Sequence, residues 1–250
     1  MSRHRNPFTF GELVQDEAFT DRRDELAQLN RDLENGQNVV LVAPRRLGKS
    51  SLVQTALRTA AARGTLVVEV DLMTTPTKER FAAKLAKSIH DDVASPVNRA
   101  KEALNAFRSL RVNPTVTVGD DGSFRFGFSA AREQADIDDT IERLLELPAE
   151  IAAERGRPLV AFFDEFQEVT EIDPHLPALM RSIFQRQGQV AHVYAGSKRD
   201  MMQRLFNDEN EPFYRSAKTM EIGPIEPTLF RPFLAAQFAR VVLNGRPVPA

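Results

Sequence analysis

An eight-residue stretch between an apolar segment and a helix-forming segment carries residue types that bind phosphate: Ala43, Pro44, Arg45, Arg46, Leu47, Gly48, Lys49 and Ser50. Except at Ala43, it matches the pattern G-x-x-x-x-G-K-[ST]. Gly48 leaves room for backbone N–H groups to face a phosphate, Lys49 can reach the outer phosphates, and Ser50 can ligate Mg²⁺. Alanine is the smallest replacement for the first glycine, provided that φ stays negative at Ala43. The stretch, extended to Ser51, predicts a phosphate-binding loop; the alternative is an ordinary strand-to-helix turn with a surface lysine.

Two adjacent acids, Asp164 and Glu165, directly follow the apolar residues 158–163. Carboxylates at the carboxyl end of a buried strand lie where α/β sheets bind their ligands. Asp164 is suited to hold Mg²⁺ through water, and Glu165 is suited to polarise a water molecule for attack on a phosphate. The alternative is that the pair only caps a following helix. Together with the loop, the acid pair predicts a protein that binds ATP with Mg²⁺ and hydrolyses it.

A small hydroxyl, Ser197, ends another apolar segment, residues 189–197. At the carboxyl edge of a sheet it could hydrogen-bond the attacking water or the γ-phosphate. It could equally cap the helix predicted to start at residue 198. The sequence leaves both alternatives open.

Composition limits the classes of function. The 250 residues contain 33 Lys and Arg against 35 Asp and Glu, so net charge favours neither nucleic acid nor an anionic membrane. The absence of cysteine excludes disulfides, thiol catalysis and thiolate metal sites. The four histidines have no spacing typical of a zinc site, and His192, in an apolar segment, is predicted to be buried and hydrogen-bonded. No apolar segment approaches the roughly 18 residues of a membrane span, and the first ten residues do not resemble a signal peptide. We therefore expect a soluble cytoplasmic protein.

Helical and strand patterns alternate along the chain, which predicts an α/β domain with a mainly parallel sheet. The first helix should have an apolar stripe of leucines, a cap at Thr20 or Asp21, and an end at Gly36. Pro148 should kink or split its helix. The expected helices cover residues 20–36, 49–64, 77–92, 137–156, 174–188, 198–206 and 227–242, and the expected strands cover 38–43, 65–72, 158–163, 189–197 and 217–222.

Residues 95–135 interrupt this alternation and are predicted to be an insertion. Within them, apolar residues alternate on both sides of Gly119-Asp120-Asp121-Gly122, a pattern typical of a β-hairpin. One side carries Phe124, Phe126 and Phe128 at every second position, so their shared face must be covered. We expect it to pack on the parent domain; the alternative is a docking face for a partner or another protomer.

Five stretches carry a family resemblance: NPFTFGELVQDEAFTDRRDEL, APRRLGKSSL, FFDEFQEV, YAGSKRDMMQRLF and PFYRSAKTMEIGPIEP. They resemble the AAA+/STAND group of P-loop ATPases, nearest to its archaeal-type ATPase branch, which is related to origin-recognition ATPases. The resemblance implies a five-stranded sheet in which one strand separates the acidic strand from the phosphate-loop strand. It also implies that Phe19 helps form an adenine pocket and that Arg215 senses the γ-phosphate or acts on a neighbouring protomer.

The resemblance further implies a division of the chain. Residues 1–226 would form the ATPase core, with residues 1–37 on its adenine side, and residues 227–250 would begin a helical lid that is incomplete at the end of the sequence.

The expected function is ATP hydrolysis with Mg²⁺, driving a switch or machine that acts on a protein or DNA partner. The partner is unknown, a homo-oligomer is compatible with the sequence, and DNA binding has no support from the charge. One alternative is a nucleotide-gated scaffold that does not hydrolyse ATP. A small-molecule kinase is a weaker alternative, because a phosphoryl acceptor other than water would not need Glu165.

Overall fold

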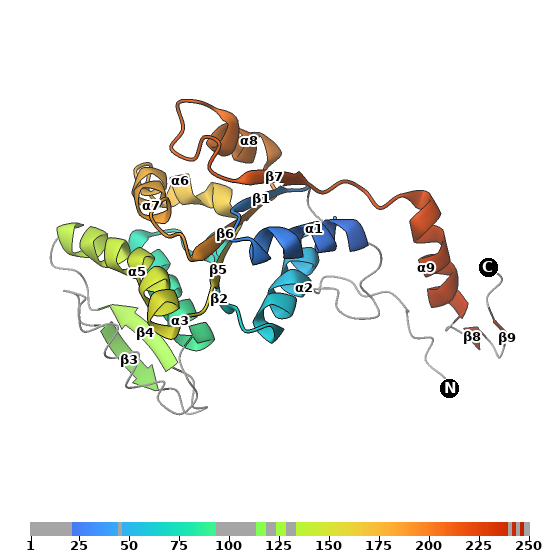
Figure 1. Cartoon of the computed structure of the whole chain (residues 1–250), viewed down its shortest axis with the longest axis horizontal. Coiled ribbons are helices and arrows are strands. Elements are labelled where there is room, and N and C mark those ends of the chain that lie inside the picture. The colour runs from blue at the N-terminus through green and yellow to red at the C-terminus, as the bar shows by residue number, and fades with distance from the viewer. Residues whose placement is uncertain are drawn as a thin grey trace.

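A five-stranded sheet lies at the centre of the computed structural model, which describes residues 22–44, 47–93, 114–118, 124–128, 134–239, 242–243 and 246–247 (Figure 1). The strand order is β2-β5-β6-β1-β7, and all neighbouring strands pair in parallel. The strands are β1 (Val39–Val42), β2 (Leu66–Asp71), β5 (Leu159–Asp164), β6 (Val190–Gly196) and β7 (Lys218–Glu221). The predicted parallel sheet is confirmed. The acidic strand β5 is separated from β1 by β6 alone, as the resemblance implied.

Helices cover both faces of the sheet. On one face lie α1 (Arg23–Glu34) and α2 (Lys49–Ala62); on the other lie α3 (Lys78–Val93), α5 (Gln134–Arg155), α7 (Leu176–Phe184) and α8 (Arg199–Asn207). Alternate residues of β1 enter opposite clusters: Val39 and Leu41 pack under α1 and α2, whereas Val40 and Val42 pack on the other face. Burial on both faces explains why the central strands are almost continuously apolar.

Short elements complete the described chain. They are η2 (Leu72–Thr74), η3 (Phe166–Glu168), α6 (Val169–Ile172), β8 (Val242–Leu243) and β9 (Arg246–Pro247). The sequence patterns did not predict η3 or α6, which follow the acid pair directly. Such short turns leave too few residues for a helical period to be recognised.

The first helix follows its predicted stripe but not its predicted cap. Leu29 and Leu33 are buried, and Leu26 packs beside them. Gly36 has a positive φ of 67° just after the helix, as an ending glycine should. The residue before the first helical turn is Arg22, whereas Thr20 and Asp21 lie outside the described residues. The predicted capping position was therefore wrong.

Pro148 does not split its helix: α5 runs continuously from Gln134 to Arg155 with the proline inside it. Proline removes one backbone hydrogen bond from a helix. Leu144, Leu145 and Leu147, next to the proline, are nearly fully buried. Packing of this apolar face outweighs the lost hydrogen bond. The expected split was therefore wrong, whereas the kink, the other outcome expected at Pro148, stays a prediction.

The two strands of the predicted hairpin are confirmed, whereas the assignment of residues 95–135 to an insertion stays a prediction. Strands β3 (Pro114–Val118) and β4 (Phe124–Phe128) pair antiparallel, with Val116 opposite Phe126. Strand β4 lies beside α3, at the end of the molecule opposite α9 (Figure 1). The side chains of Phe124, Phe126 and Phe128 and the turn at 119–122 lie outside what the structure describes, so the covering of the phenylalanine face stays a prediction.

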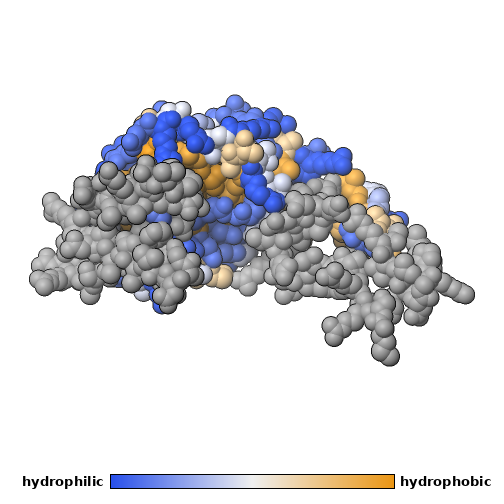
Figure 2. Space-filling model, turned by 90° about the horizontal axis from the view of Figure 1, so that it is seen from below, coloured by the Kyte–Doolittle hydropathy of each residue, from blue (hydrophilic) through white to orange (hydrophobic). Residues whose placement is uncertain are grey.

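Helix α9 (Pro227–Ala239) stands apart from the sheet and its covering helices (Figure 1). Three of its apolar side chains are exposed, Leu229, Phe230 and Phe238. Figure 2 shows hydrophobic surface on this outlying helix and also in the middle of the molecule, among described surface that is otherwise mostly polar. Its assignment to a lid stays a prediction. Among the described helices, none combines the length and apolar character needed to cross a membrane.

Candidate functional site

The carboxyl ends of three neighbouring strands bring the predicted chemical groups together. Strand β1 leads into the loop before α2, β5 ends at Asp164, and β6 ends at Gly196, just before Ser197. In the register, Val42 lies opposite Gly196, and Phe163, next to Asp164, lies opposite Tyr194. Parallel pairing therefore places these strand ends at one edge of the sheet.

Lys49 and Ser50 contact the acid pair directly. The Lys49 Nζ lies 3.2 Å from Asp164 Oδ1 and 3.4 Å from Glu165 Oε1. The Ser50 hydroxyl donates to Asp164 Oδ2 at 3.3 Å. Lys49 is 6% exposed, so its ammonium is largely withdrawn from water and depends on these two carboxylates. A surface lysine, the alternative reading of the loop, does not agree with this burial.

Glu165 occupies a strained turn and receives several hydrogen bonds. Its backbone is left-handed, with φ 49° and ψ 47°, a conformation that is uncommon for a residue with a side chain. Its Oε2 accepts hydrogen bonds from the Ser197 hydroxyl at 2.7 Å and from Gln167 Nε2 at 2.6 Å. Burial alone would raise the pKa of Glu165, but the hydrogen bonds from Gln167 and Ser197, together with Lys49, lower that pKa below its ordinary value. The carboxylate is thus held in its charged form.

Ser197 contacts the acid pair rather than capping a helix. Helix α8 begins at Arg199 with Lys198 at the capping position, and no side-chain hydrogen bond caps it. The Ser197 hydroxyl is directed to Glu165 instead. The cap therefore does not agree with the structure. The predicted hydrogen bond of Ser197 to the attacking water or the γ-phosphate stays a prediction.

Gly48 and Ala43 have the backbone conformations that the pattern requires. Gly48 has a φ of 81°, which favours glycine. Ala43 is fully buried, and its φ is negative, since the described non-glycine residues with positive φ are Arg22, Glu165 and Arg215. The condition for tolerating alanine at the first glycine position is therefore met.

The remaining predicted loop residues take different positions. Pro44 is exposed, Leu47 is partly exposed, and Ser51 is buried on α2. Arg45, Arg46 and Phe19 lie outside the described residues, so their predicted contacts with nucleotide stay predictions.

Arg22 is a functional candidate that the site prediction missed. Its side chain is 5% exposed, and its Nη2 donates to Leu47 O in the loop at 3.0 Å and to Gly223 O after β7 at 2.6 Å. Its Nη1 donates to Glu25 at 3.0 Å. The guanidinium thus connects the loop to the segment between β7 and α9. The available sequence signal was an arginine just before the first helix, within the first stretch of the resemblance.

Gln167 is a second residue that the site prediction missed. It is fully buried, and its amide nitrogen donates to both Glu165 and Glu168. The signal in the sequence was a glutamine two residues after the acid pair, in the FFDEFQEV stretch of the resemblance.

Arg215 does not join the other candidates. Its neighbour Ser216 accepts a hydrogen bond from Asn38, which precedes β1, so Arg215 lies near the amino edge of the sheet. The phosphate loop lies beyond the other end of β1, roughly 13 Å along a four-residue strand. Arg215 is exposed, and its guanidinium lies 5.0 Å from the centre of the Tyr214 ring. Direct sensing of γ-phosphate in its own chain does not agree with this position, whereas action on a neighbouring protomer stays a prediction.

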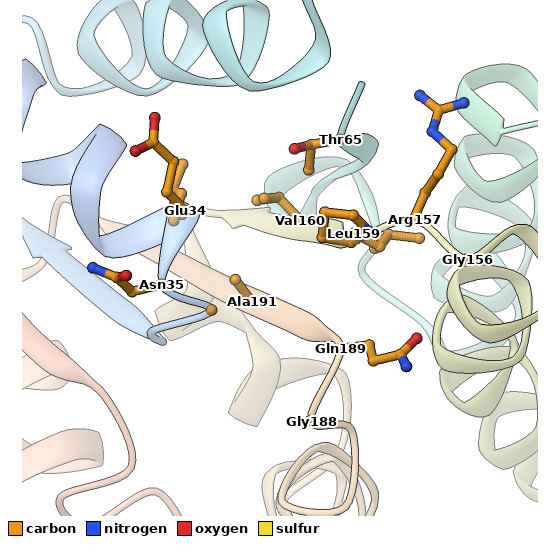
Figure 3. A pocket seen from close by; sticks show the side chains of 13 residues that line it. Glu34, Asn35, Thr65, Gly156, Arg157, Leu159, Val160, Gly188, Gln189 and Ala191 are labelled. Carbon is orange, nitrogen blue, oxygen red and sulfur yellow. The ribbon is translucent and has the colours of Figure 1, made fainter. Parts of the chain in front are cut away.

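A hollow of about 430 Å³ lies at the amino edge of the sheet, between the end of α1 and the starts of β2, β5 and β6 (Figure 3). Glu34, Thr65, Arg157 and Gln189 contribute polar side chains to its wall. None of the predicted site residues that the structure describes lines it. The hollow and the acid pair are therefore separate features at opposite edges of one sheet.

The oxygen atoms of Ser50 and Asp164 fit a hard divalent cation. Mg²⁺ prefers oxygen ligands and is usually bound by one or two protein groups together with phosphate oxygens and water. Within the described residues, no three His, Cys, Asp or Glu side chains are grouped to hold a metal by themselves. The donor set fits Mg²⁺ that is shared with a nucleotide.

Solved structures share the fold. The Walker-type ATPase paby2304 of Pyrococcus abyssi is similar with a TM-score of 0.64, at 18% identity over 98% of this chain and 64% of that chain. The Aeropyrum pernix ORC1 protein in complex with DNA gives 0.57, at 16% identity over 91% of this chain and 51% of that one. The Aeropyrum pernix ORC2 protein in ADPNP-ADP complexes has a TM-score of 0.55, at 14% identity over 94% of this chain and 55% of that chain. This chain thus spans 51 to 64% of their lengths.

No curated protein matches the sequence. The model of a family described as "AAA ATPase domain" matches residues 18–194, which is well over half of the chain and includes both the phosphate loop and the acid pair. The fold agrees with this match, since the loop strand and the acidic strand take the places that a P-loop ATPase requires. The chain belongs to the AAA ATPase domain family.

Proposed function

We propose that this chain binds ATP with Mg²⁺ at the carboxyl edge of its sheet and hydrolyses the bond between the β- and γ-phosphates. One observation carries the proposal: Lys49, Ser50, Asp164, Glu165 and Ser197 converge there from three strand ends, within hydrogen-bond or ion-pair distance of one another. Neighbours in nucleotide complexes, such as the ORC2 protein, support the choice of ligand.

The contacts indicate how nucleotide would be received. The Lys49 ammonium, now between two carboxylates, would turn to the β- and γ-phosphates, whose charge is greater. Backbone N–H groups around Gly48, at the start of α2, would face the same phosphates. Ser50 and Asp164 would hold Mg²⁺, whose charge offsets that of the β- and γ-phosphates. Arg45 and Arg46 would add positive charge to the loop, Ser51 would support it, and Phe19 would contact the adenine.

Glu165 would carry the chemical step. Its carboxylate would accept a proton from water as the water oxygen bonds to the γ-phosphorus. The bond from that phosphorus to the bridging oxygen would break, and ADP and inorganic phosphate would be released. The lowered pKa of Glu165 keeps it unprotonated at neutral pH, so it can accept this proton.

The test is phosphate release from ATP with Mg²⁺, measured for the wild type, Glu165→Gln and Lys49→Ala. Glu165→Gln should lower turnover by about 10²- to 10⁴-fold and keep ATP affinity, because the amide cannot accept a proton. Lys49→Ala should weaken ATP binding in calorimetry, because the phosphates lose a direct cationic partner.

Other outcomes would identify the alternatives. ATP binding with equal background release from the wild type and Glu165→Gln would leave a nucleotide-gated scaffold. ATP that stays intact until a small-molecule acceptor is added would indicate a kinase. No heat from ATP and Mg²⁺ with the wild type would defeat the proposal.

The energy of hydrolysis would drive a change that acts on a macromolecular partner, a protein or DNA. The ORC1 neighbour was solved in complex with DNA, which makes DNA worth testing. Because the formal net charge of this chain is −2, its overall charge does not favour a polyanion. Fluorescence titration of labelled duplex DNA at two salt concentrations distinguishes the two partners. Affinity that falls steeply with salt supports DNA, and no affinity leaves a protein as the partner.

A further inference from the structure

Gln167 lies inside the turn that follows the acid pair, with none of its surface exposed. Its Nε2 donates to Glu165 Oε2 at 2.6 Å and to Glu168 Oε1 at 3.2 Å. Glu168 Oε1 also pairs with Lys198 Nζ at 2.7 Å. Ionised carboxylates only accept hydrogen bonds, so the amide nitrogen must face both of them and the amide oxygen must face away.

That oxygen has no hydrogen-bond donor. Among the buried side-chain nitrogen and oxygen atoms described, Gln167 Oε1 is the one without a partner. It points at Gly196, where an added Cβ would overlap it. A buried acceptor without a donor lowers stability, and a methionine of similar length would fill the same space without this cost. Packing alone therefore does not explain why a glutamine occupies this position. The hydrogen bonds of its amide nitrogen do explain it.

The contacts make the two oxygens of Glu165 unequal. Oε2 accepts from both Ser197 and Gln167, at 2.7 and 2.6 Å. Oε1 contacts Lys49 at 3.4 Å. In the proposed function, Lys49 turns to the phosphates, and Oε1 then becomes the oxygen that is available to water.

We infer that Gln167 is a positioning residue for hydrolysis, which together with Ser197 fixes Glu165 Oε2 so that Oε1 faces the attacking water. The inference rests on the proposed function. Two donors are needed because the last torsion of a glutamate side chain is broad, so one hydrogen bond leaves the carboxylate free to turn about that bond. A second donor from another direction fixes the carboxylate plane.

The test is Gln167→Met, which keeps the length of the side chain and removes its donor. The matched control is Gln187→Met, a buried glutamine whose amide donates to Leu145 O at 2.8 Å, outside the site. For the wild type and both variants, kcat and KM are measured by phosphate release, and ATP affinity is measured by calorimetry. Gln167→Met should lower kcat about 10- to 100-fold, because misplacement of a reacting group by about 1 Å has effects of this size. KM and affinity should stay within about threefold, since no phosphate contact is lost.

A second readout needs no ATP. The Glu168 N–H donates to Glu165 O at 2.9 Å and closes the turn. Hydrogen exchange across residues 165–168 should be faster in Gln167→Met than in the wild type and unchanged in the control. If Gln167→Met does not fold, Gln167→Leu replaces it, since it is also apolar, lacks the donor and should lower kcat by a similar factor.

The outcomes separate the two proposals. A wild type without turnover overturns the proposed function and this inference with it. An active wild type with unchanged kcat in both Gln167 variants overturns this inference alone. Equal losses in kcat and ATP affinity would assign Gln167 a structural role and overturn this inference. Exchange that is unchanged in the turn would show that Gln167 does not hold Glu165, and would overturn it as well.

Discussion

Two buried polar clusters lie at opposite edges of the same sheet and differ in charge. At the carboxyl edge, the Gln167 amide lies between the carboxylates of Glu165 and Glu168, and its Oε1 has no hydrogen-bond partner. At the amino edge, Gln187 accepts a hydrogen bond from His192 Nε2 at 3.1 Å and donates to a backbone oxygen at 2.8 Å.

The amino-edge cluster is neutral. Burial lowers the pKa of His192 to about 3, so its ring is uncharged at neutral pH. Asn38 Oδ1 accepts the backbone N–H of His192 at 2.9 Å, which completes the cluster. The difference teaches that the buried cluster at the amino edge carries no charge, whereas the cluster at the proposed site keeps charges and an unpaired acceptor that stability alone would not select.

The two ends of β6 offer the sharpest test of this difference. At Gly196, an added Cβ would overlap Met202 and Gln167, so Gly196→Ala should lower the free energy of unfolding by about 1–3 kcal/mol and also lower turnover. At Gly188, before β6, a Cβ meets nothing within 4 Å, so Gly188→Ala should change stability by less than about 0.5 kcal/mol. Urea denaturation and phosphate release measure both effects. Equal stability of the two variants would mean that the space around Gly196 is not closely packed.

The amino-edge cluster should make stability depend on pH. The folded-state pKa of His192 lies below its ordinary value, so the unfolded chain binds the proton more readily. Stability is therefore fully present above about pH 6.5 and is lost as pH falls toward 3. Between pH 6.5 and pH 5 the loss should be roughly 1.5 kcal/mol. His192→Phe, compared with the wild type by denaturation at both pH values, should reduce this loss and leave turnover at pH 7.5 unchanged; an identical pH dependence in both proteins would contradict the prediction.

At the carboxyl edge, Arg22 supports the loop from outside the acid pair. Arg22→Lys keeps the charge but has one nitrogen in place of the two guanidinium nitrogens, Nη1 and Nη2, that bond Glu25 and the two backbone oxygens, so it loses part of this set of contacts. ATP affinity should fall about tenfold, or about 1.4 kcal/mol, because the loop loses one fixed carbonyl contact. Calorimetry measures the change, and Arg23→Lys, at the adjacent exposed position, is the control. Unchanged affinity would show that the loop keeps its shape without Arg22.

The smallest effect is expected at Arg215, which lies near the amino edge. Arg215→Gln should leave stability within about 0.5 kcal/mol and leave ATP affinity unchanged. A role on a neighbouring protomer would show instead as lower turnover only at protein concentrations where the wild type associates, followed by light scattering. Weaker ATP binding by dilute, monomeric protein would mean that Arg215 reaches its own nucleotide.

Much of the fold could be predicted because its signals are local. The leucine stripe of α1, the apolar strands and the hairpin of the insertion each follow from the types and spacing of nearby residues. Errors arose where tertiary packing outweighed a local rule. Pro148 stays inside α5 because its leucine neighbours are buried, and α1 begins after Arg22, whose side chain is used elsewhere.

The candidate site divides in the same way. Lys49 follows Gly48 directly and Glu165 follows Asp164 directly, so peptide geometry alone keeps each motif together, and the sequence by itself determined the loop, the acid pair and the parallel α/β class. Only the tertiary structure decided that Ser197 and Gln167 share one oxygen of Glu165, that Arg22 joins Leu47 to Gly223, and that Arg215 lies at the other edge. The physical reason is that all but one of these relations join segments far apart in the chain, and the remaining one, between Glu165 and Gln167, depends on the direction of a buried side chain. Strand order and packing set both, and no spacing in the sequence encodes them.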